Sequence, residues 1–208
     1  MSLDRVAVRE ALALASAAVL VEFASSTGRG KAVDHRIFRA VNRGHGARAD
    51  AFFGGLTELG SIAASAAAGV ALAAGGRRKT ALRGLGAAGT MWLVGQGMKR
   101  LYLRSRPYDA LPEVVRLLIG RPKGTSWPSS HPAVLLAFVS VAGEELGLSV
   151  AERAALGALI GLVAASRVYL GVHYPSDVLA GLLLGRAAGL AWLAAGRPSV
   201  PVSGAPAG

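Results

Sequence analysis

Six apolar runs, each bounded or interrupted by charged residues, constrain the fold of this chain more than any other feature of its sequence. No run reaches the roughly 20 clean apolar residues of a simple membrane-spanning helix. With its flanking turns, however, each run is long enough for a helix of about 17 to 22 residues. The runs are 11–21, 61–76, 84–98, 132–143, 154–166 and 178–196. They predict an all-α fold: a polytopic membrane helical bundle with about six transmembrane helices.

The alternative is a soluble, alanine-rich bundle, and the distribution of polar residues argues against it. Only 17% of residues are charged and 52% are hydrophobic, whereas a soluble domain carries about 25% charged residues. Polar positions do not recur with the helical period in the second, third, fifth and sixth runs. Glycines at four-residue spacing match the small-residue pattern of packed membrane helices, although an Ala/Gly-rich composition explains them equally well. These glycines are Gly157, Gly161, Gly181, Gly185 and Gly189.

The charge balance indicates an anionic partner. The net charge is +11, from 23 Lys and Arg against 12 Asp and Glu. Nucleic acid is a poor fit, because the basic residues are split among apolar segments and only 6% of residues are aromatic. Anionic lipid or a phosphate-bearing substrate fits better. The absence of cysteine excludes a disulfide-stapled secreted module and a cysteine-ligated metal cluster.

The arginine-rich stretch 25–50 separates the first two runs. Its apolar positions share one face of a helix, which predicts an interfacial amphipathic helix. These positions are Val33, Ile37, Phe38 and Val41. His35 and His45, in the same stretch, are expected to be solvated.

The chain is predicted to form a single integral-membrane domain over residues 1–198. No cleavable signal peptide is evident, because the first apolar run lacks both the usual basic start and a clear exit site. The remaining residues, 199–208, are rich in proline and glycine and are predicted to form a disordered tail.

Three polar clusters stand at the mouths of the apolar runs. The first, 99–107, has four cations within eight residues, a pattern usual for interfacial anchoring. In the second, 127–132, a proline directly follows His131 and suits the first helical position. We therefore expect Ser129, Ser130 and His131 at a helix N-terminus, where free N–H groups and the helix dipole favour an anion.

The third cluster, 166–177, contains Arg167 and His173. Pro175 marks the start of the last helix, which places Asp177 in its first turn. The chain descends one helix after the second cluster and returns along another before the third, so both clusters are expected at the same membrane face. The third run brings the first cluster to that face too. A pocket that combines cations, imidazoles and a carboxylate suits phosphoryl chemistry.

The spacing within these clusters resembles the three-part signature of the type 2 phosphatidic acid phosphatase (PAP2) superfamily. The matching motifs are Lys99-x6-Arg106-Pro107, Pro128-Ser129-Ser130-His131 and Ser166-Arg167-x5-His173-x3-Asp177. The superfamily also includes lipid phosphate phosphatases, bacterial acid phosphatases and vanadium haloperoxidases. The six-helix layout is similar to that of its membrane members. One departure is Ser130, where the family usually has a glycine that lets the backbone approach the phosphate.

The resemblance implies three catalytic residues. His173 would be the nucleophile that forms a phosphohistidine. Asp177 would accept a hydrogen bond from the other ring nitrogen and orient the imidazole. His131 would protonate the leaving alkoxide and then activate the water that hydrolyses the intermediate.

The resemblance also implies the residues that bind the substrate phosphate. Lys99, Arg106 and Arg167 would clamp its oxygens, with the amide and hydroxyl of Ser129 assisting and Ser130 beside them. No metal and no cofactor is implied, because the cations supply the positive charge.

The implied substrate has its head group in water and its tail in the lipid bilayer, such as a lipid phosphate or a prenyl phosphate or diphosphate. A polyprenyl-phosphosugar phosphatase of cell-wall synthesis is an alternative within the same chemistry. The segment 111–120 either contacts the tail or forms an interfacial loop. The family implies a multi-pass protein of the cell membrane with an extracytoplasmic site, and a homo-oligomer is compatible with the sequence.

Three other interpretations compete. A vanadate-dependent haloperoxidase shares the fold, but those enzymes are soluble and generally larger. A non-catalytic membrane protein that binds anionic lipid would need cations but no imidazole. A transporter would use Arg186 and Glu22 as intramembrane charges, although no inverted repeat is apparent.

Overall fold

The computed structural model describes residues 3–196, and all the regular structure in that range is helical. The elements are α1 (Leu3–Ser26), α2 (Gly28–Asn42), α3 (Ala47–Leu56), the 3-10 helix η1 (Thr57–Gly60), α4 (Ile62–Ala74), α5 (Arg78–Leu101), α6 (Pro107–Ala110), α7 (Ser130–Glu145), α8 (Val150–Tyr169) and α9 (Pro175–Ala195). The prediction of an all-α fold is confirmed. The predicted tail, 199–208, lies outside the described residues.

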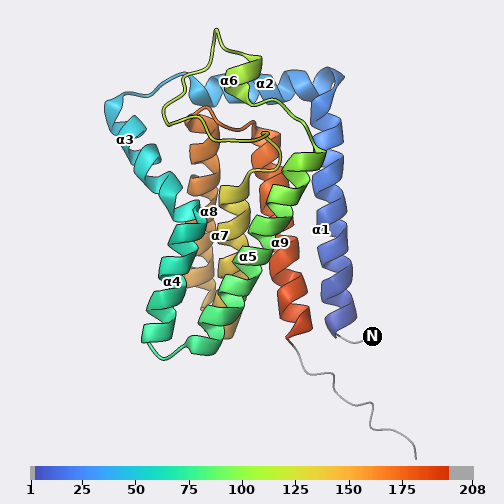
Figure 1. The fold of residues 1–208 in the computed structure, drawn as a ribbon, viewed down its shortest axis with the longest axis vertical. Helices are drawn as coiled ribbons and strands as arrows, with labels where there is room; N and C mark the ends of the chain where they lie inside the picture. The colour runs from blue at the N-terminus through green and yellow to red at the C-terminus, as the bar shows by residue number, and fades with distance from the viewer. Residues whose placement is uncertain (1–2, 197–208) are drawn as a thin grey trace, which may run out of the picture.

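Six long helices correspond to the six apolar runs and stand side by side (Figure 1). The central α7 packs against α4, α5, α8 and α9, while α1 packs along α9. The start of α1 and the end of α9 lie at the same end of this bundle (Figure 1). Helices α2 and α6 and the loop 102–129 cover the opposite end, which we call the upper end.

Local signals explain several helix boundaries. Ser149 caps α8 through a capping box in which its side chain and that of Glu152 bond each other's backbone amides. Pro175 occupies the first position of α9, as predicted. Helix α7, however, begins at Ser130, so Pro132 is its third residue rather than its first. Proline is tolerated there because first-turn amides have no partner within the helix.

The glycines of α9 allow it to approach α7 closely. A Cβ atom built on Gly181 would lie 2.3 Å from the carbonyl oxygen of Ser129, and one on Gly185 would lie 2.4 Å from that of Ala133. The small-residue spacing in α9 therefore has a packing function. Gly157 and Gly161 in α8 have nothing within 4 Å of such an atom, so the same spacing there reflects composition.

Helix α2 is the amphipathic helix predicted within 25–50, and it lies across the upper end of the bundle (Figure 1). Its apolar positions divide between two environments. Phe38 is fully buried and packs with Val41 against α8 and α9, whereas Val33 and Ile37 remain exposed. His45 is exposed, as expected, but His35 is only half-exposed, because its ring stacks on that of Tyr174 at 5.1 Å.

The structure does not confirm six membrane spans. Within residues 3–196, α9 alone is sufficiently long and apolar to cross a bilayer, and half of its apolar window is buried in the protein. The bent unit of α3, η1 and α4 would qualify as a second span if its two halves, which meet at 62°, are counted together. Helix α4 by itself is only about 20 Å long at 1.5 Å per residue.

Candidate active site

A cavity of about 220 Å³ lies beneath the loops of the upper end, between the start of α4, α5, α7 and the loop before α9. Six of the eight predicted site residues line it: Lys99, Arg106, Ser130, His131, Arg167 and His173. The convergence of the three sequence clusters is therefore confirmed. Ser129 and Asp177 do not line this cavity and lie behind its wall.

His173 lies in the loop between α8 and α9 and is 2% exposed. Its Nε2 atom is 3.3 Å from Nη1 of Arg106. A guanidinium can only donate hydrogen bonds, so Nε2 must accept and the ring proton resides on Nδ1. Burial, reinforced by the positive charges of Arg106, Arg167 and Lys99, holds the pKa of His173 well below its ordinary value. The imidazole is therefore neutral at physiological pH, and the electron pair of Nε2 is directed at Arg106.

Asp177, the third residue of α9, is completely buried behind His173. Its Oδ2 atom is 3.5 Å from Nδ1 of His173, which is close enough for electrostatic attraction but not for a strong hydrogen bond. Oδ2 also accepts hydrogen bonds from the Ser126 hydroxyl and the Tyr174 amide, and Oδ1 accepts one from Arg104. Asp177 is thus a firmly held carboxylate that faces the protonated side of the imidazole.

The cavity has a positive wall. Arg106 and Arg167 are 2% and 3% exposed, and Lys99 reaches the cavity from the last turn of α5. Arg106 donates from Nη1 to the carbonyl of Val172 and from Nε to that of Gly124, both at 2.9 Å. These two donors therefore hold the loops that carry Val172 and Gly124. Among the described residues that line the cavity, none is acidic. Such a pocket favours an anion.

Unpartnered donors add to this preference. Arg167 donates from Nη1 to the Thr57 hydroxyl at 2.6 Å. Its Nε and the hydroxyls of Ser129 and Ser130 are buried and have no hydrogen-bond partner within residues 3–196. Buried donors normally find a partner, and an oxyanion in the cavity would supply acceptors for Arg167 and Ser130.

The two serines at the start of α7 have different surroundings. Ser129 is fully buried, and its amide donates to the carbonyl of Asp177 at 3.0 Å, so that amide ties α7 to α9. Ser130 lines the cavity at the position where the family usually has glycine. A Cβ atom at Gly95 on α5 would lie 3.3 Å from the Ser130 hydroxyl, so a side chain there would crowd Ser130.

Comparison with known proteins finds similar sequences and a similar fold. Residues 104–199 match the model of the PAP2 superfamily. The fold resembles that of a transmembrane PAP2-type phosphatidylglycerolphosphate phosphatase from Bacillus subtilis, with a TM-score of 0.75 and 26% identity over 90% of this chain and 94% of that one. The chain is therefore similar to PAP2 phosphatases in the sequence of residues 104–199 and in its fold.

Two further relatives are similar over smaller regions. LpxE of Aquifex aeolicus has a TM-score of 0.68 and 26% identity, covering 76% of this chain and 93% of that one. The decaprenylphosphoryl-5-phosphoribose phosphatase of Mycobacterium tuberculosis, in two strains, is 35% identical over 92 residues. This alignment includes 44% of the present chain and 48% of the relative, so the chain spans about half the length of the curated relatives it matches.

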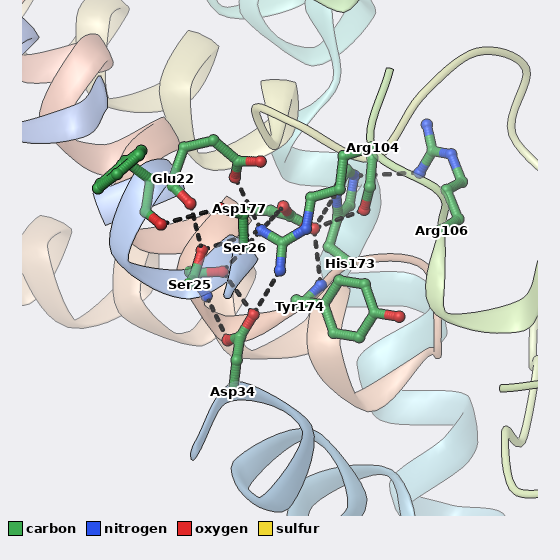
Figure 2. Close-up of polar contacts among 12 residues, drawn as sticks. Glu22, Ser25, Ser26, Asp34, Arg104, Arg106, His173, Tyr174 and Asp177 are labelled. Carbon is green, nitrogen blue, oxygen red and sulfur yellow. Dashed lines mark hydrogen bonds and ion pairs between the residues drawn. The ribbon is translucent and has the colours of Figure 1, made fainter. Parts of the chain in front are cut away.

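One group of residues in this chain is not predicted by the sequence motifs. The local pattern assigns Arg104 only to an anchoring cluster, yet its guanidinium forms ion pairs with Glu22, Asp34 and Asp177 (Figure 2). Glu22, the candidate intramembrane charge of a transporter, is therefore neutralised within the protein. The sequence offers only two signals for this group: an arginine two residues before Arg106, and a single aspartate, Asp34, within a basic helix.

Loop 111–120 packs onto the protein. Leu111 and Val115 pack against the buried cluster around Phe38 and Tyr174, and Asn42 fastens the main chain of Arg116 with two hydrogen bonds. These contacts favour the interfacial-loop interpretation of this segment over contact with a lipid tail.

Proposed function

We propose that this protein is an integral-membrane phosphatase that hydrolyses a lipid or polyprenyl phosphate monoester or diphosphate, without a metal ion, through a phosphohistidine. The observation that carries the proposal is the cavity itself, in which two imidazoles and three buried or half-buried cations meet without an acidic lining residue. Similarity to the PAP2 superfamily supports the reaction class. Binding of anionic lipid alone would not require the two histidines.

The first chemical step would be attack by Nε2 of His173 on phosphorus. A bond forms between Nε2 and phosphorus while the bond from phosphorus to the lipid oxygen breaks. His131, which must carry a second ring proton at this stage, gives that proton to the departing alkoxide. Water then attacks the phosphohistidine and transfers a proton to His131, which releases phosphate and restores both histidines. The carboxylate of Asp177, which faces the protonated Nδ1 of His173, stabilises the positive charge that the ring acquires.

Charge stabilisation would come from the cations. Lys99, Arg106 and Arg167 surround the position of the phosphoryl oxygens, where negative charge accumulates in the transition state. Removal of one preorganised donor of this kind costs roughly 10²–10³-fold in rate. These side chains would supply the electrostatic role that a metal ion has in other phosphoryl-transfer sites.

We further propose that the protein is a multi-pass protein of the cell membrane with the upper end extracytoplasmic. The outer faces of the bundle carry large exposed apolar side chains, which a lipid environment would cover. Examples are Leu20 at 65%, Val70 at 68%, Leu82 at 71% and Leu93 at 64% exposed. They lie on α1, α4 and α5, so several helices besides α9 would face lipid.

A narrower substrate is favoured by the relatives. The name of the mycobacterial relative describes action on a decaprenyl-linked phosphoribose, so a polyprenyl-phosphosugar phosphatase is the second candidate. The structural relative from Bacillus subtilis is named for phosphatidylglycerolphosphate. Both substrates combine a phosphate monoester with a long apolar tail, and the proposed chemistry serves either.

The test is phosphate release by detergent-purified protein with EDTA present. The panel contains decaprenylphosphoryl-5-phosphoribose, phosphatidylglycerol phosphate, phosphatidic acid, farnesyl diphosphate and the water-soluble p-nitrophenyl phosphate. We expect EDTA-resistant release from lipid substrates and a loss of several orders of magnitude in His173→Ala. Wild-type silence across the panel would contradict the proposal, as would near-normal turnover by His173→Ala. Complete inhibition by EDTA would refute the metal-free mechanism.

A further inference from the structure

The side chains of Arg104 and Arg106 point to different sides of the segment that follows α5. Arg106 lines the catalytic cavity and contacts His173, whereas Arg104 points to a group of carboxylates (Figure 2). Arg104 lines a separate hollow of about 560 Å³, and its side chain is 12% exposed. It is therefore a cation of the signature region without contact to the catalytic cavity.

Three carboxylates from three helices converge on this one guanidinium. Nη1 of Arg104 lies 2.9 Å from Glu22 of α1 and 2.8 Å from Asp177 of α9, and Nη2 lies 2.6 Å from Asp34 of α2. Nη1 also donates to the Ser176 hydroxyl at 2.8 Å. The guanidinium lies 4.6 Å from the centre of the Tyr174 ring, which fixes its position further.

Electrostatics make this arrangement depend on Arg104. The side chains of Glu22, Asp34 and Asp177 are only 11%, 4% and 0% exposed, so water screens their mutual repulsion poorly. Burial lowers the pKa of Arg104, but the three carboxylates outweigh burial and raise it overall. Without the guanidinium, three buried acids would face one another.

The cluster connects directly to the nucleophile. Arg104 holds Oδ1 of Asp177, while Oδ2 faces Nδ1 of His173 at 3.5 Å. Arg104 thus holds one carboxylate oxygen, and the other oxygen is directed at the imidazole. Ser126 and Tyr174 complete the orientation by donating to Oδ2.

We propose that Arg104 is a positioning residue, which keeps Asp177 charged and aimed at Nδ1 of His173 and so sets the rate of the chemical step. The proposal rests on the phosphatase function proposed above. It also gives α1 and α2 a part in catalysis, because Glu22 and Asp34 hold the guanidinium that holds Asp177.

The experiment measures kcat and KM of Arg104→Gln on the panel substrate that the wild type hydrolyses fastest. Residues that orient the ligands of catalytic metals contribute about 10–100-fold to activity, and by analogy we expect kcat to fall by about this factor. KM should stay within about twofold, because Lys99, Arg106 and Arg167 are unchanged and contribute the uniform binding of the phosphate.

Three control variants separate positioning from general stability. Glu22→Gln removes the ion pair between Arg104 and α1 but keeps the ion pair between Arg104 and Asp177. It should therefore lower kcat far less than Arg104→Gln. Arg104→Lys keeps the charge without the fork and should recover part of the loss. Arg100→Gln removes an exposed cation of the same cluster and should match the wild type.

Each outcome decides a different question. Absence of wild-type turnover on the panel would defeat the phosphatase function itself. Wild-type turnover with an equally active Arg104→Gln variant would overturn the positioning role. An equal loss in Glu22→Gln and Arg104→Gln would also overturn it, because Arg104 would then only tie α1 to the bundle. If Arg104→Gln does not fold, Arg104→Lys must show the lowered kcat with unchanged KM, and wild-type kinetics in that variant would refute the inference.

Discussion

At the scale of single residues, the position of the ring proton on His173 follows from its two neighbours. Arg106 can only donate to Nε2, and Asp177 can only attract the proton on Nδ1 when it is ionised. The surrounding cations oppose a second proton on the ring. The same side chains that would bind phosphate therefore also keep the nucleophile unprotonated.

This coupling predicts a change in pH dependence for Arg106→Gln. Burial and then Arg106 are the largest causes of the lowered pKa of His173. Removing that charge raises the pKa, so the neutral imidazole is lost at a higher pH as the solution is acidified. We expect the acid limb of kcat/KM to move to higher pH, with a rate loss of roughly 10²–10³-fold.

The measurement compares the pH profiles of the variant and the wild type on one substrate. Ionisation of the substrate is common to both profiles, so a difference between them belongs to the protein. Arg100→Gln is the charge-matched control. Coincident acid limbs would show that Arg106 does not influence the proton on His173.

At the scale of elements, glycine spacing has a different meaning in α8 and α9. The two helices carry the same four-residue repeat, but only the α9 glycines lie against another backbone. The contact matters to the site, because α7 begins at Ser130 beside His131 and α9 carries Asp177. The helix contact thus sets the distance between residues on which the chemistry depends.

Stability measurements can test this difference with Gly185→Ala and Gly157→Ala. The new methyl group at 185 would lie within 3.0 Å of three backbone atoms of Ala133, so the helices must separate. We expect a loss of about 1–3 kcal/mol, typical of overpacking. At 157 there is open space, and alanine should stabilise the helix by up to about 1 kcal/mol. Thermal unfolding in detergent distinguishes them, and equal midpoints for the two variants would contradict the close approach.

At the scale of the whole molecule, the bundle has two chemically different ends. The upper end holds the cavity and the covering loops, and the opposite end holds the basic turn before α5 and the turn between α7 and α8 (Figure 1). A multi-pass arrangement would place these ends on opposite sides of the membrane.

The lack of native cysteine makes this orientation directly measurable. Glu113→Cys at the upper end and Lys79→Cys at the opposite end both replace exposed residues. We expect a membrane-impermeant maleimide to label only Glu113→Cys in intact cells and both variants in lysed cells. Labelling of Lys79→Cys alone would reverse the orientation, and labelling of both in intact cells would contradict a membrane between the two ends.

Local patterns in the sequence determine much of the fold and of the candidate site. The apolar runs predict the six long helices, because a chain that buries long apolar segments must pair its backbone groups within each segment. The spacing of residues within each polar cluster then determines which side chains share a helix end. Lys99, His131 and His173 are therefore predictable as neighbours at one face, and all three line the same cavity. The number of membrane spans is not predictable in this way, because a run such as 61–76 contains a helix of only 13 residues.

What only the tertiary structure decided was the partner of each charge. Arg104 is separated from Glu22, Asp34 and Asp177 by 82, 70 and 73 positions in the chain, and no periodicity in a sequence encodes such a convergence. An arginine at a helix end has the same local pattern whether it anchors to lipid headgroups or neutralises buried acids. The packing of α1, α2 and α9 around Arg104 decides between these two roles. Burial makes unpaired carboxylates costly, so the buried acids require the arginine as a partner.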